Sequence, residues 1–558
     1  MSIKFSSGRR RVKIVCVAAV AGILAPVALT SCAPAASPDD NTITIFASQY
    51  GQMDLNTNSF TKELEQKFGV DLVFQTTTAD GASASQALNV SLAGGQLPDA
   101  YMLIPWVAQL TPSQVQKYGD QGLFIPLNDL ITQYAPNVNK FLTTIPDFKA
   151  MTTTPTGKIY GLPQWNDCFH CSYPAKYWIN TTWLEKLNLQ VPKTVDEFYS
   201  AMVAFKDKDP NGNGKKDEIP MSGSALELII PFFMNAFIYN GWYESTATGP
   251  VSLGLSSAGK VQLQPAQDGW REGLKYLNKL WAAGLVDQGT FSQTPETLQK
   301  TANSASGVLI GGSSAMHPSL FVTIPSGDGR EWQYNALAPL TGPSGQQFAT
   351  YQTPIMPGAT FAITNKASAA KQKVLMEIVD YLFTTEGAIR GQFGVEGIGW
   401  RKPEAGDVAL DSNLTPLYYV FPTDDKNPEY YNGLWGAVAQ YGSTREFRDS
   451  QVQPMDTNSV EGYERRLFDA TKLYEGKEDQ SSLFKWWTVW PAESDSAELS
   501  TTQTNVETYI RTSAAEFITG TRDPNSDADW QAYLSGLNGM GADRYIEIWQ
   551  KAMDSAPK

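Results

Sequence analysis

Residues 207–220 read D-K-D-P-N-G-N-G-K-K-D-E-I-P and hold many oxygen-bearing side chains. Carboxylate and amide oxygens at alternate positions around a glycine are ligands that calcium prefers in a tight loop. The pattern fits two registers, which begin at Asp207 and at Asp209. The first aims the ammonium group of Lys215 at the ion, whereas the second uses only its backbone carbonyl, so charge favours the second.

The second register predicts a metal site with six ligands: Asp209, Asn211, Asn213, Lys215, Asp217 and Glu218. The alternative is a solvated turn that binds no metal, because Asn, Asp and Gly favour tight turns by themselves. Calcium chooses oxygen ligands and lacks redox chemistry. The sequence therefore predicts calcium as a structural cofactor.

Residues for nucleophilic or zinc chemistry are scarce. The chain has two histidines and four cysteines, and it contains no Gly-x-Ser-x-Gly motif. Cys168 and Cys171 form one C-x-x-C pair without a second pair. In an exported protein we expect a local disulfide between them, with free thiols as the alternative.

The N-terminus has the order of an export signal. A basic patch precedes an apolar run over residues 14–29, which ends at Leu-Thr-Ser-Cys with Cys32. The run is about as long as a short membrane span, so an uncleaved anchor is the alternative. The four residues resemble the lipobox of bacterial lipoproteins, which implies that Cys32 is lipidated. We expect a protein anchored by lipid on the outer face of the cytoplasmic membrane, outside the cytoplasm.

The charge of the chain limits its partners. Five of the 43 basic residues and none of the 57 acidic residues precede Cys32, so the rest of the chain has a net charge of −19. Such a surface discourages nucleic acid as a partner. We expect a monomer.

Apolar periodicity predicts an α/β fold. Residues 42–46 and 70–74 alternate as strands, and residues 60–68 between them have helical spacing, which is typical of a βαβ unit. Residues 98–103 are a third strand candidate. Helical spacing then dominates, at residues 195–205, 269–283, 370–386 and 504–519.

Several segments resemble the large solute-binding lipoproteins of bacterial ABC transporters, in particular the group that binds oligosaccharides such as alginate and fructooligosaccharides. They are residues 94–99, where Gly94 replaces the serine of the family, 122–130, 134–137, 192–198, 273–281, 284–287, 380–387, 394–400, 517–520 and 530–534. The calcium loop belongs to the resemblance, in the register from Asp209. The resemblance covers nearly the whole chain after residue 42. It implies a two-lobed fold like that of periplasmic binding proteins, with a hinge and a large helical share.

The expected organisation has four parts. Residues 1–32 form the signal peptide and residues 33–40 a tether. The first α/β lobe takes residues 41–165 and about 355–405, and the second, more helical lobe takes residues 166–354 and about 406–558.

A sugar site needs aromatic platforms and side chains that donate and accept hydrogen bonds, because a sugar ring has an apolar face and a hydroxyl edge. Such residues beside glycine, proline or an amide are the candidates: Tyr50, Asp54, Trp165, Asn166, Asp167, Asn235, Trp242, Trp400, Arg401 and Trp435. The run at residues 486–491 is the densest in tryptophan, but it fits a core stripe equally well.

The expected function is a non-catalytic receptor that captures an oligosaccharide between two lobes and delivers it to the permease subunits of an ABC importer. A secreted glycoside hydrolase is the first alternative, since it would pair the same aromatic residues with two carboxylates. A peptide receptor is the second. A peptide receptor would need charged side chains that bind the peptide termini, and Arg401 is the one cationic residue among the candidates.

Overall fold

The structure is a computed structural model that describes residues 41–50, 52–224, 226–241, 249–250, 252–424 and 426–556. The predictions for the signal peptide, the tether, Cys32 and Trp242 lie outside these residues. Within the described ranges, no helix combines the length and the apolar character that a membrane span requires.

A four-stranded sheet forms the first part of the fold, in the order β10-β3-β1-β2. β1 (Thr42–Gln49) runs parallel to β2 (Asp71–Thr78) and to β3 (Ala100–Met102), and β10 (Phe361–Ile363) is antiparallel to β3. With α1 (Ser59–Phe68) between β1 and β2, the predicted βαβ unit is confirmed.

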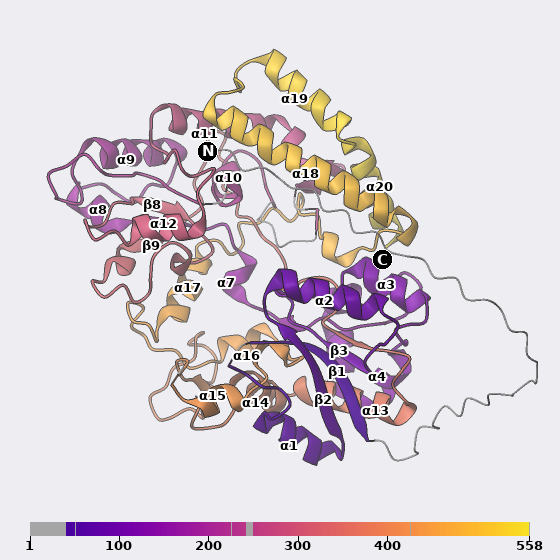
Figure 1. Ribbon diagram of the computed structural model, residues 1–558. Helices are drawn as coiled ribbons and strands as arrows, with labels where there is room; N and C mark the ends of the chain where they lie inside the picture. Colours follow the sequence, from indigo (N-terminus) through magenta and orange to yellow (C-terminus); the bar gives the residue numbers. More distant parts are fainter. Residues whose placement is uncertain are drawn as a thin grey trace, which may run out of the picture. The chain divides into compact units, whose positions relative to one another are not determined.

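Helices cover both faces of this sheet. Ile43, Ile45 and Ala47 of β1 pack into a core with α1 and α13 (Ala369–Leu382), whereas Phe46 packs into a core with α2 (Gly81–Ala93). α1 and α2 accordingly lie on opposite sides of the strands (Figure 1). Successive strand residues face opposite sides, and therefore a strand buried on both faces is apolar at nearly every position.

A second, more helical core surrounds the antiparallel sheet β8-β5-β9, made of Gly312–Ser314, Tyr177–Asn180 and Tyr334–Leu337. α11 (Asp268–Ala282) buries Trp270, Leu274 and Leu277, whose spacing of three and four residues places them on one face. α18 (Ser496–Thr519) packs against α11 and against α20 (Ala542–Ser555), and α18 and α20 run side by side in Figure 1.

The remaining elements complete and surround these cores. They are α3 (Pro112–Asp120), α4 (Asn128–Tyr134), α5 (Pro136–Thr144), α6 (Pro146–Thr152), β4 (Trp165–Asn166), α7 (Phe169–Ser172), α8 (Thr181–Lys186), α9 (Val195–Asp207), α10 (Leu226–Met234), β6 (Leu253–Leu255), β7 (Val261–Leu263), α12 (Pro295–Ala302), α14 (Thr385–Phe393), β11 (Trp400–Arg401), β12 (Tyr419–Val420), α15 (Pro428–Asn432), β13 (Gly442–Ser443), α16 (Arg445–Asp449), α17 (Tyr463–Lys472) and α19 (Asp527–Gly539), with short 3-10 turns between some of them.

The chain passes from the first core to the second after β4, returns between Ala349 and Ile355, and passes to the second core again after β13. β4 and β13 pair in parallel. Because β13 returns to β4, the residues just before it stay with the first sheet. Leu434, Trp435, Val438, Ala439 and Tyr441 therefore pack into the first core, beyond the boundary expected near residue 405.

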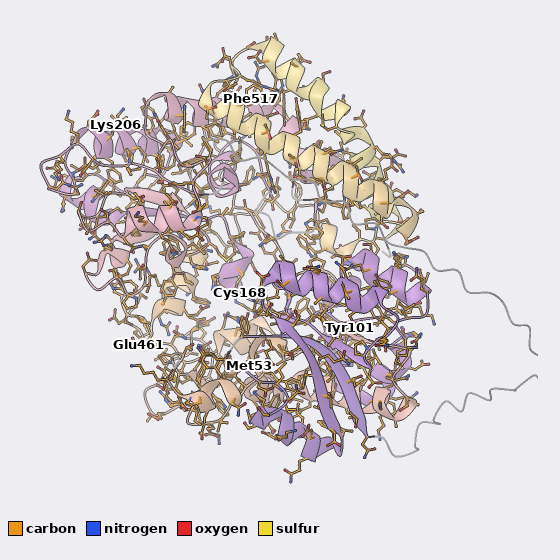
Figure 2. The ribbon with its side chains drawn as sticks, viewed as in Figure 1. Met53, Tyr101, Cys168, Lys206, Glu461 and Phe517 are labelled. Atoms are coloured by element: carbon orange, nitrogen blue, oxygen red, sulfur yellow. A yellow bond between two sulfur atoms is a disulfide. The ribbon has the colours of Figure 1, made fainter. Side chains whose placement is uncertain are left out.

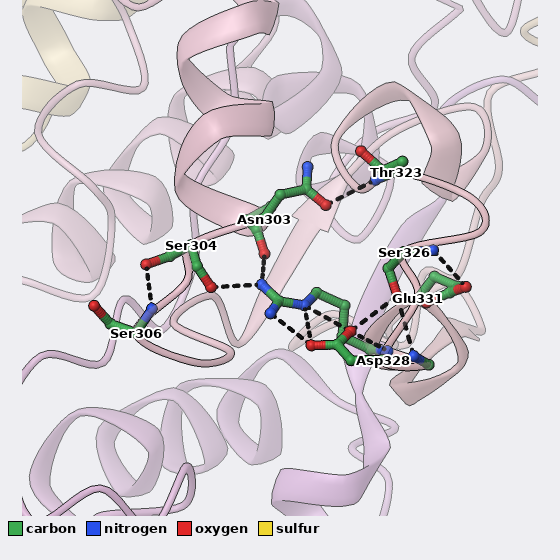
Figure 3. Close-up of polar contacts among 10 residues, drawn as sticks. Asn303, Ser304, Ser306, Thr323, Ser326, Asp328 and Glu331 are labelled. Atoms are coloured by element: carbon green, nitrogen blue, oxygen red, sulfur yellow. Dashed lines mark hydrogen bonds and ion pairs between the residues drawn. The ribbon is translucent and has the colours of Figure 1, made fainter.

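A polar network fixes the loop that leads into β9 (Figure 3). The Arg330 guanidinium pairs with Asp328 across 2.6 Å and donates to the carbonyl of Ser304 across 2.8 Å. Asn303 Oδ1 accepts a hydrogen bond from the Thr323 amide. These bonds tie the end of α12 to the loop, which keeps β9 in register with β5.

Candidate ligand-binding site

The carboxyl ends of β1 and β3 carry an exposed aromatic pair. Trp106 follows β3 and is 52% exposed, and Tyr50 follows β1 and is 39% exposed. Trp106 Nε1 donates to the Tyr50 hydroxyl across 3.3 Å. In α/β folds ligands bind outside the carboxyl ends of the strands, so this pair lies where a ligand is expected. Tyr50 was a candidate from the sequence and Trp106 was not.

A pocket of about 510 Å³ lies beside the start of β10. Because β10 is antiparallel to β3, Pro357 just before it lies at the same sheet edge as the end of β3, and Leu110 pairs with Ala359 there. α3 and α6 on the first side and α18 and α20 on the second contribute to the pocket wall. Residues from both cores thus form this pocket.

The chemistry of the pocket wall is aromatic and neutral. Its lining residues are Thr111, Pro112, Ser113, Gln114, Met151, Pro357, Trp486, Trp487, Val489, Trp490, Pro491, Ser496, Leu499, Ser500, Gln503, Thr504 and Trp549. Trp486 is half-buried and offers a stacking surface, whereas Trp487, Trp490 and Trp549 are buried behind the wall. The hydroxyl and amide groups both donate and accept hydrogen bonds. Within the described part of the chain, no charged side chain lines this pocket.

Local hydrogen bonds position the aromatic wall. Trp487 Nε1 donates to Asp147 Oδ2 across 3.0 Å, and Trp490 Nε1 donates to the Ala150 carbonyl across 2.9 Å. Both bonds end on α6, so they fix the 486–491 segment against the first core. Opposite, Thr111 caps α3 in a capping box with Gln114, which holds the first turn of α3 in place.

Three of the candidates from the sequence, Trp165, Asn235 and Trp435, are buried in the structure. Trp165 packs edge-on against Phe148, and Trp435 is completely buried and donates from Nε1 to Thr61. The Asn235 amide is also buried, and it hydrogen-bonds to the Pro231 carbonyl and to Thr350. Apolar burial of the two indoles and internal bonding of the amide explain these positions.

Asn166 and Asp167 belong to a polar network at the crossing between the cores. Asn166 Oδ1 accepts from Arg448 across 2.8 Å, and Arg448 lies 3.7 Å from Glu464. Burial raises the pKa of Asp167, although the nearby Arg445 and Arg448 oppose the shift. Arg448 therefore already donates a hydrogen bond to the side-chain oxygen of Asn166.

The other candidates lie elsewhere. Asp54 accepts bonds from the Asn56 amide and the Thr57 hydroxyl, which closes the turn after β1. Trp400 Nε1 donates to the Gly394 carbonyl. Arg401 pairs with Asp407 across 2.7 Å and lines a separate pocket of about 360 Å³. The structure does not bring these three residues to the wall of the 510 Å³ pocket.

In the loop after α9, polar side chains hydrogen-bond to one another and to the backbone. Asp209 accepts hydrogen bonds from the amides of Gly212 and Gly214, each across 2.8 Å, while Asp207 is the last residue of α9. Asn211 and Asn213 both direct their side-chain amides at Asp217. These bonds link Asn211, Asn213 and Asp217, three of the six ligands predicted in the register that begins at Asp209.

Glu218 provides a test of whether a cation fits this loop. Both carboxylate oxygens are buried, and neither has a hydrogen-bond partner in the described structure. Burial raises the pKa of Glu218, and the negative charges of Asp209 and Asp217 raise it further. An unpaired buried carboxylate beside two others is costly unless a cation neutralises it, so these residues fit a hard cation.

Comparison with known proteins agrees with this fold. The chain is 25% identical over 519 residues to the fructooligosaccharide ABC transporter substrate-binding protein FusA of Streptococcus pneumoniae, covering 90% of this chain and 87% of FusA. It is 22% identical over 499 residues to the lipoprotein LipO of Bacillus subtilis, covering 88% and 85%.

Solved structures show the same two-lobed fold. A solute-binding protein of Bifidobacterium longum infantis, described as binding HMO, matches with a TM-score of 0.74 and 21% identity over 92% of this chain and 98% of that chain. FusA in complex with kestose matches with a TM-score of 0.68 and 22% identity over 92% and 99%. Residues 54–389 match the family model of the bacterial extracellular solute-binding proteins. The chain belongs to the bacterial extracellular solute-binding protein family.

Proposed function

We propose that this protein is the substrate-binding component of an ABC importer and that it binds an oligosaccharide at the carboxyl edge of its first sheet. The observation that carries the proposal is the 510 Å³ pocket with tryptophan and neutral hydrogen-bonding residues from both cores. The exposed pair of Tyr50 and Trp106 at the same edge would extend the binding surface.

The neutral wall suits a neutral sugar. An uncharged hydroxyl exchanges hydrogen bonds with amides and hydroxyls such as Gln503 and Thr504, and the apolar face of the ring stacks on an indole. A ligand that touches α3 and α18 at once stabilises the arrangement in which the two cores approach each other. Binding and delivery require no bond breaking.

A glycoside hydrolase is less well supported. Hydrolysis of a glycosidic bond generally requires two carboxylates on either side of it. The residues that line the 510 Å³ pocket include no Asp or Glu in the described structure. A peptide receptor also has less support, because Asp407 already pairs with Arg401.

Relatives support a carbohydrate ligand. FusA is named for fructooligosaccharide and was solved with kestose. YtcQ of Bacillus subtilis, 25% identical over 345 residues, is named as a polygalacturonan and rhamnogalacturonan-binding protein. For this chain we propose a neutral oligosaccharide, since its pocket wall carries no charge.

The extracellular family supports a location outside the cytoplasm. We further propose that Cys32 carries the lipid that anchors the protein to the outer face of the membrane, that permease subunits receive the ligand, and that the protein acts as a monomer. LipO is named a lipoprotein, which supports the anchor.

We also propose calcium at the loop after α9, with Asp209, Asn211, Asn213, Asp217, Glu218 and the Lys215 carbonyl as its ligands. The buried, unpaired carboxylate of Glu218 supports this assignment. A solved FusA variant is described as an EF-hand mutant. The ion would join the end of α9 to the next segment and so stabilise the second core, without contact with the sugar.

Calorimetry against a panel of neutral and acidic oligosaccharides tests the sugar assignment. Ser500 is exposed on α18 at the pocket wall, so Ser500→Phe should fill the pocket and abolish binding, whereas Ser500→Ala should bind nearly as well as the wild type. Equal affinity of both variants would place the ligand elsewhere. Release of shorter sugars on prolonged incubation would instead establish a hydrolase.

A further inference from the structure

Two cysteines and a histidine lie within four residues at α7, on the segment that crosses between the cores. Figure 2 labels the first of them, Cys168. A disulfide joins Cys168 to Cys171, as expected from the sequence. The sulfur atoms and a ring nitrogen of His170 lie within 4.8 Å of one another. Cys168 Sγ is 3.6 Å from His170 Nε2.

Glu464 of α17 orients the histidine. Its Oε1 lies 2.9 Å from His170 Nδ1, so Nδ1 carries the hydrogen that the carboxylate accepts. In that tautomer the lone pair is on Nε2, the atom that faces the sulfur. A carboxylate behind the distal nitrogen is the arrangement that orients histidine ligands of zinc.

The segment around α7 is itself held in place. Lys176 is buried and donates from Nζ to the His170 carbonyl across 2.8 Å. Cys168 is buried, whereas His170 and Cys171 are only half-buried. Solvent therefore reaches part of the cluster.

From this geometry we propose that Cys168, His170 and Cys171 form a binding site for a thiophilic d10 cation of the Zn²⁺ type once their disulfide is reduced. The C-x-x-C spacing is common among structural zinc ligands, and sulfur with imidazole is the donor set that zinc prefers. Three protein ligands leave a fourth position for water. The site differs from the loop after α9, whose donors are all oxygen.

The chemistry has two steps. A dithiol reductant gives two electrons and two protons to the disulfide, so that its S–S bond breaks, two thiols form, and the reductant becomes a disulfide. The cation then displaces both thiol protons to solvent and forms two metal–sulfur bonds and one bond to Nε2. Two sulfurs on one zinc ion lie about 3.8 Å apart, which the freed side chains can reach by rotation.

Cobalt(II) absorption tests the proposal, because a thiolate bound to Co²⁺ gives a charge-transfer band that oxygen ligands do not give. The full chain is first saturated with calcium to fill the oxygen loop, then reduced with a phosphine under argon and titrated with Co²⁺. We expect one band-forming equivalent per chain in the reduced protein, none in the oxidised protein, and loss of the band when Zn²⁺ is added.

Variants define the ligands. The Cys168→Ser/Cys171→Ser double variant should lose the band and corrects for thiols elsewhere in the chain. Glu464→Gln should weaken Co²⁺ binding by about 10- to 100-fold while the band is retained at saturation. His317→Gln is the matched control, since its ring lies 6.4 Å from that of His170 but outside the proposed ligand set, and its affinity should be unchanged.

Circular dichroism and a thiol titration on each reduced variant establish that it is folded and carries the expected thiols. A folded, fully reduced wild-type protein that forms no charge-transfer band would overturn the proposal. So would a band of equal strength and affinity in the double variant.

Discussion

The Trp106 indole donates to the Tyr50 hydroxyl across 3.3 Å, and both rings are exposed to solvent at the carboxyl edge of the first sheet. Large exposed aromatics are informative when they lie together at a position where folds of this type bind ligands. Apolar burial does not explain why these two rings meet. Their position agrees with the proposed binding role.

Trp106→Ala should weaken the binding of a neutral oligosaccharide by about tenfold, because a lost stacking contact removes about 1–1.5 kcal/mol. The melting temperature should change little, since the ring is half exposed. Calorimetry and thermal unfolding measure the two effects. Met455→Ala, at another highly exposed apolar side chain, is the control and should leave the affinity as it was. An unchanged affinity in Trp106→Ala would remove this pair from the site.

Chelation of calcium should lower the melting temperature while sugar affinity persists. A ligand at 100 times its Kd stabilises the folded state by about 2.7 kcal/mol, and this increment is lost when calcium is removed. Calorimetric titration of Ca²⁺ should show severe weakening in Asp217→Ala and little change in Asp207→Ala. The opposite order would restore the register that begins at Asp207, and loss of sugar binding without loss of stability would exclude a structural role.

Stability should fall between pH 6.5 and pH 4 through His317. Burial lowers the pKa of His317 from 6.5 to about 4, and the positive charges of His170 and Lys176 add to the shift. In this window the unfolded chain binds a proton that the folded chain does not, so acidification favours unfolding.

His317→Gln should remove about 1–2 kcal/mol of that pH dependence, after allowance for partial exposure of the ring. Glutamine can retain the contact that His317 Nδ1 makes with Ser319 Oγ. Denaturant unfolding at pH 4.5 and pH 7.5 measures the difference. Parallel pH profiles for the variant and the wild type would show that His317 titrates normally in the folded protein.

Trp435→Ala should destabilise the protein by about 3–5 kcal/mol, as expected for a large buried aromatic residue. The ring packs between Phe60 and Phe74, with centroids 5.2 Å and 5.4 Å away. Denaturant unfolding should report the loss, and oligosaccharide affinity should remain near that of the wild type under native conditions. A stable variant with weak affinity would return Trp435 to the binding site.

Much of the fold follows from local sequence patterns. The βαβ unit could be predicted because the apolar residues of β1 and β2 follow the period of a strand and those of α1 follow the period of a helix. The helical spacing of residues 269–283 likewise agrees with α11. The apolar spacing over residues 370–386 predicted one helix where the structure has two. α13 ends at Leu382, and Thr384 caps the next helix. Apolar spacing continues across such a cap, so periodicity alone does not reveal it.

The site was harder to predict, because its wall combines α3 and α18, segments far apart in the chain. The tryptophan run at residues 486–491 was the one signal in the sequence, and spacing could not separate a pocket wall from a core stripe. Trp435 was chosen as a candidate because glycines flank it, but its side chain is buried. Gly436 adopts a positive φ of 55° in a turn that directs the neighbouring indole into the core, so flanking glycines did not mean an exposed loop.

The pairing of β4 with β13 joins residues 165–166 to residues 442–443, and it has a consequence for secretion. A chain exported from its N-terminus presents β1, β2 and β3 long before the segments that complete their core. The first core also includes Leu483 and Trp487, so it cannot close until the residues through Trp487 have left the export channel. Most of the second core has then also emerged, so the two halves must mature together and not one after the other.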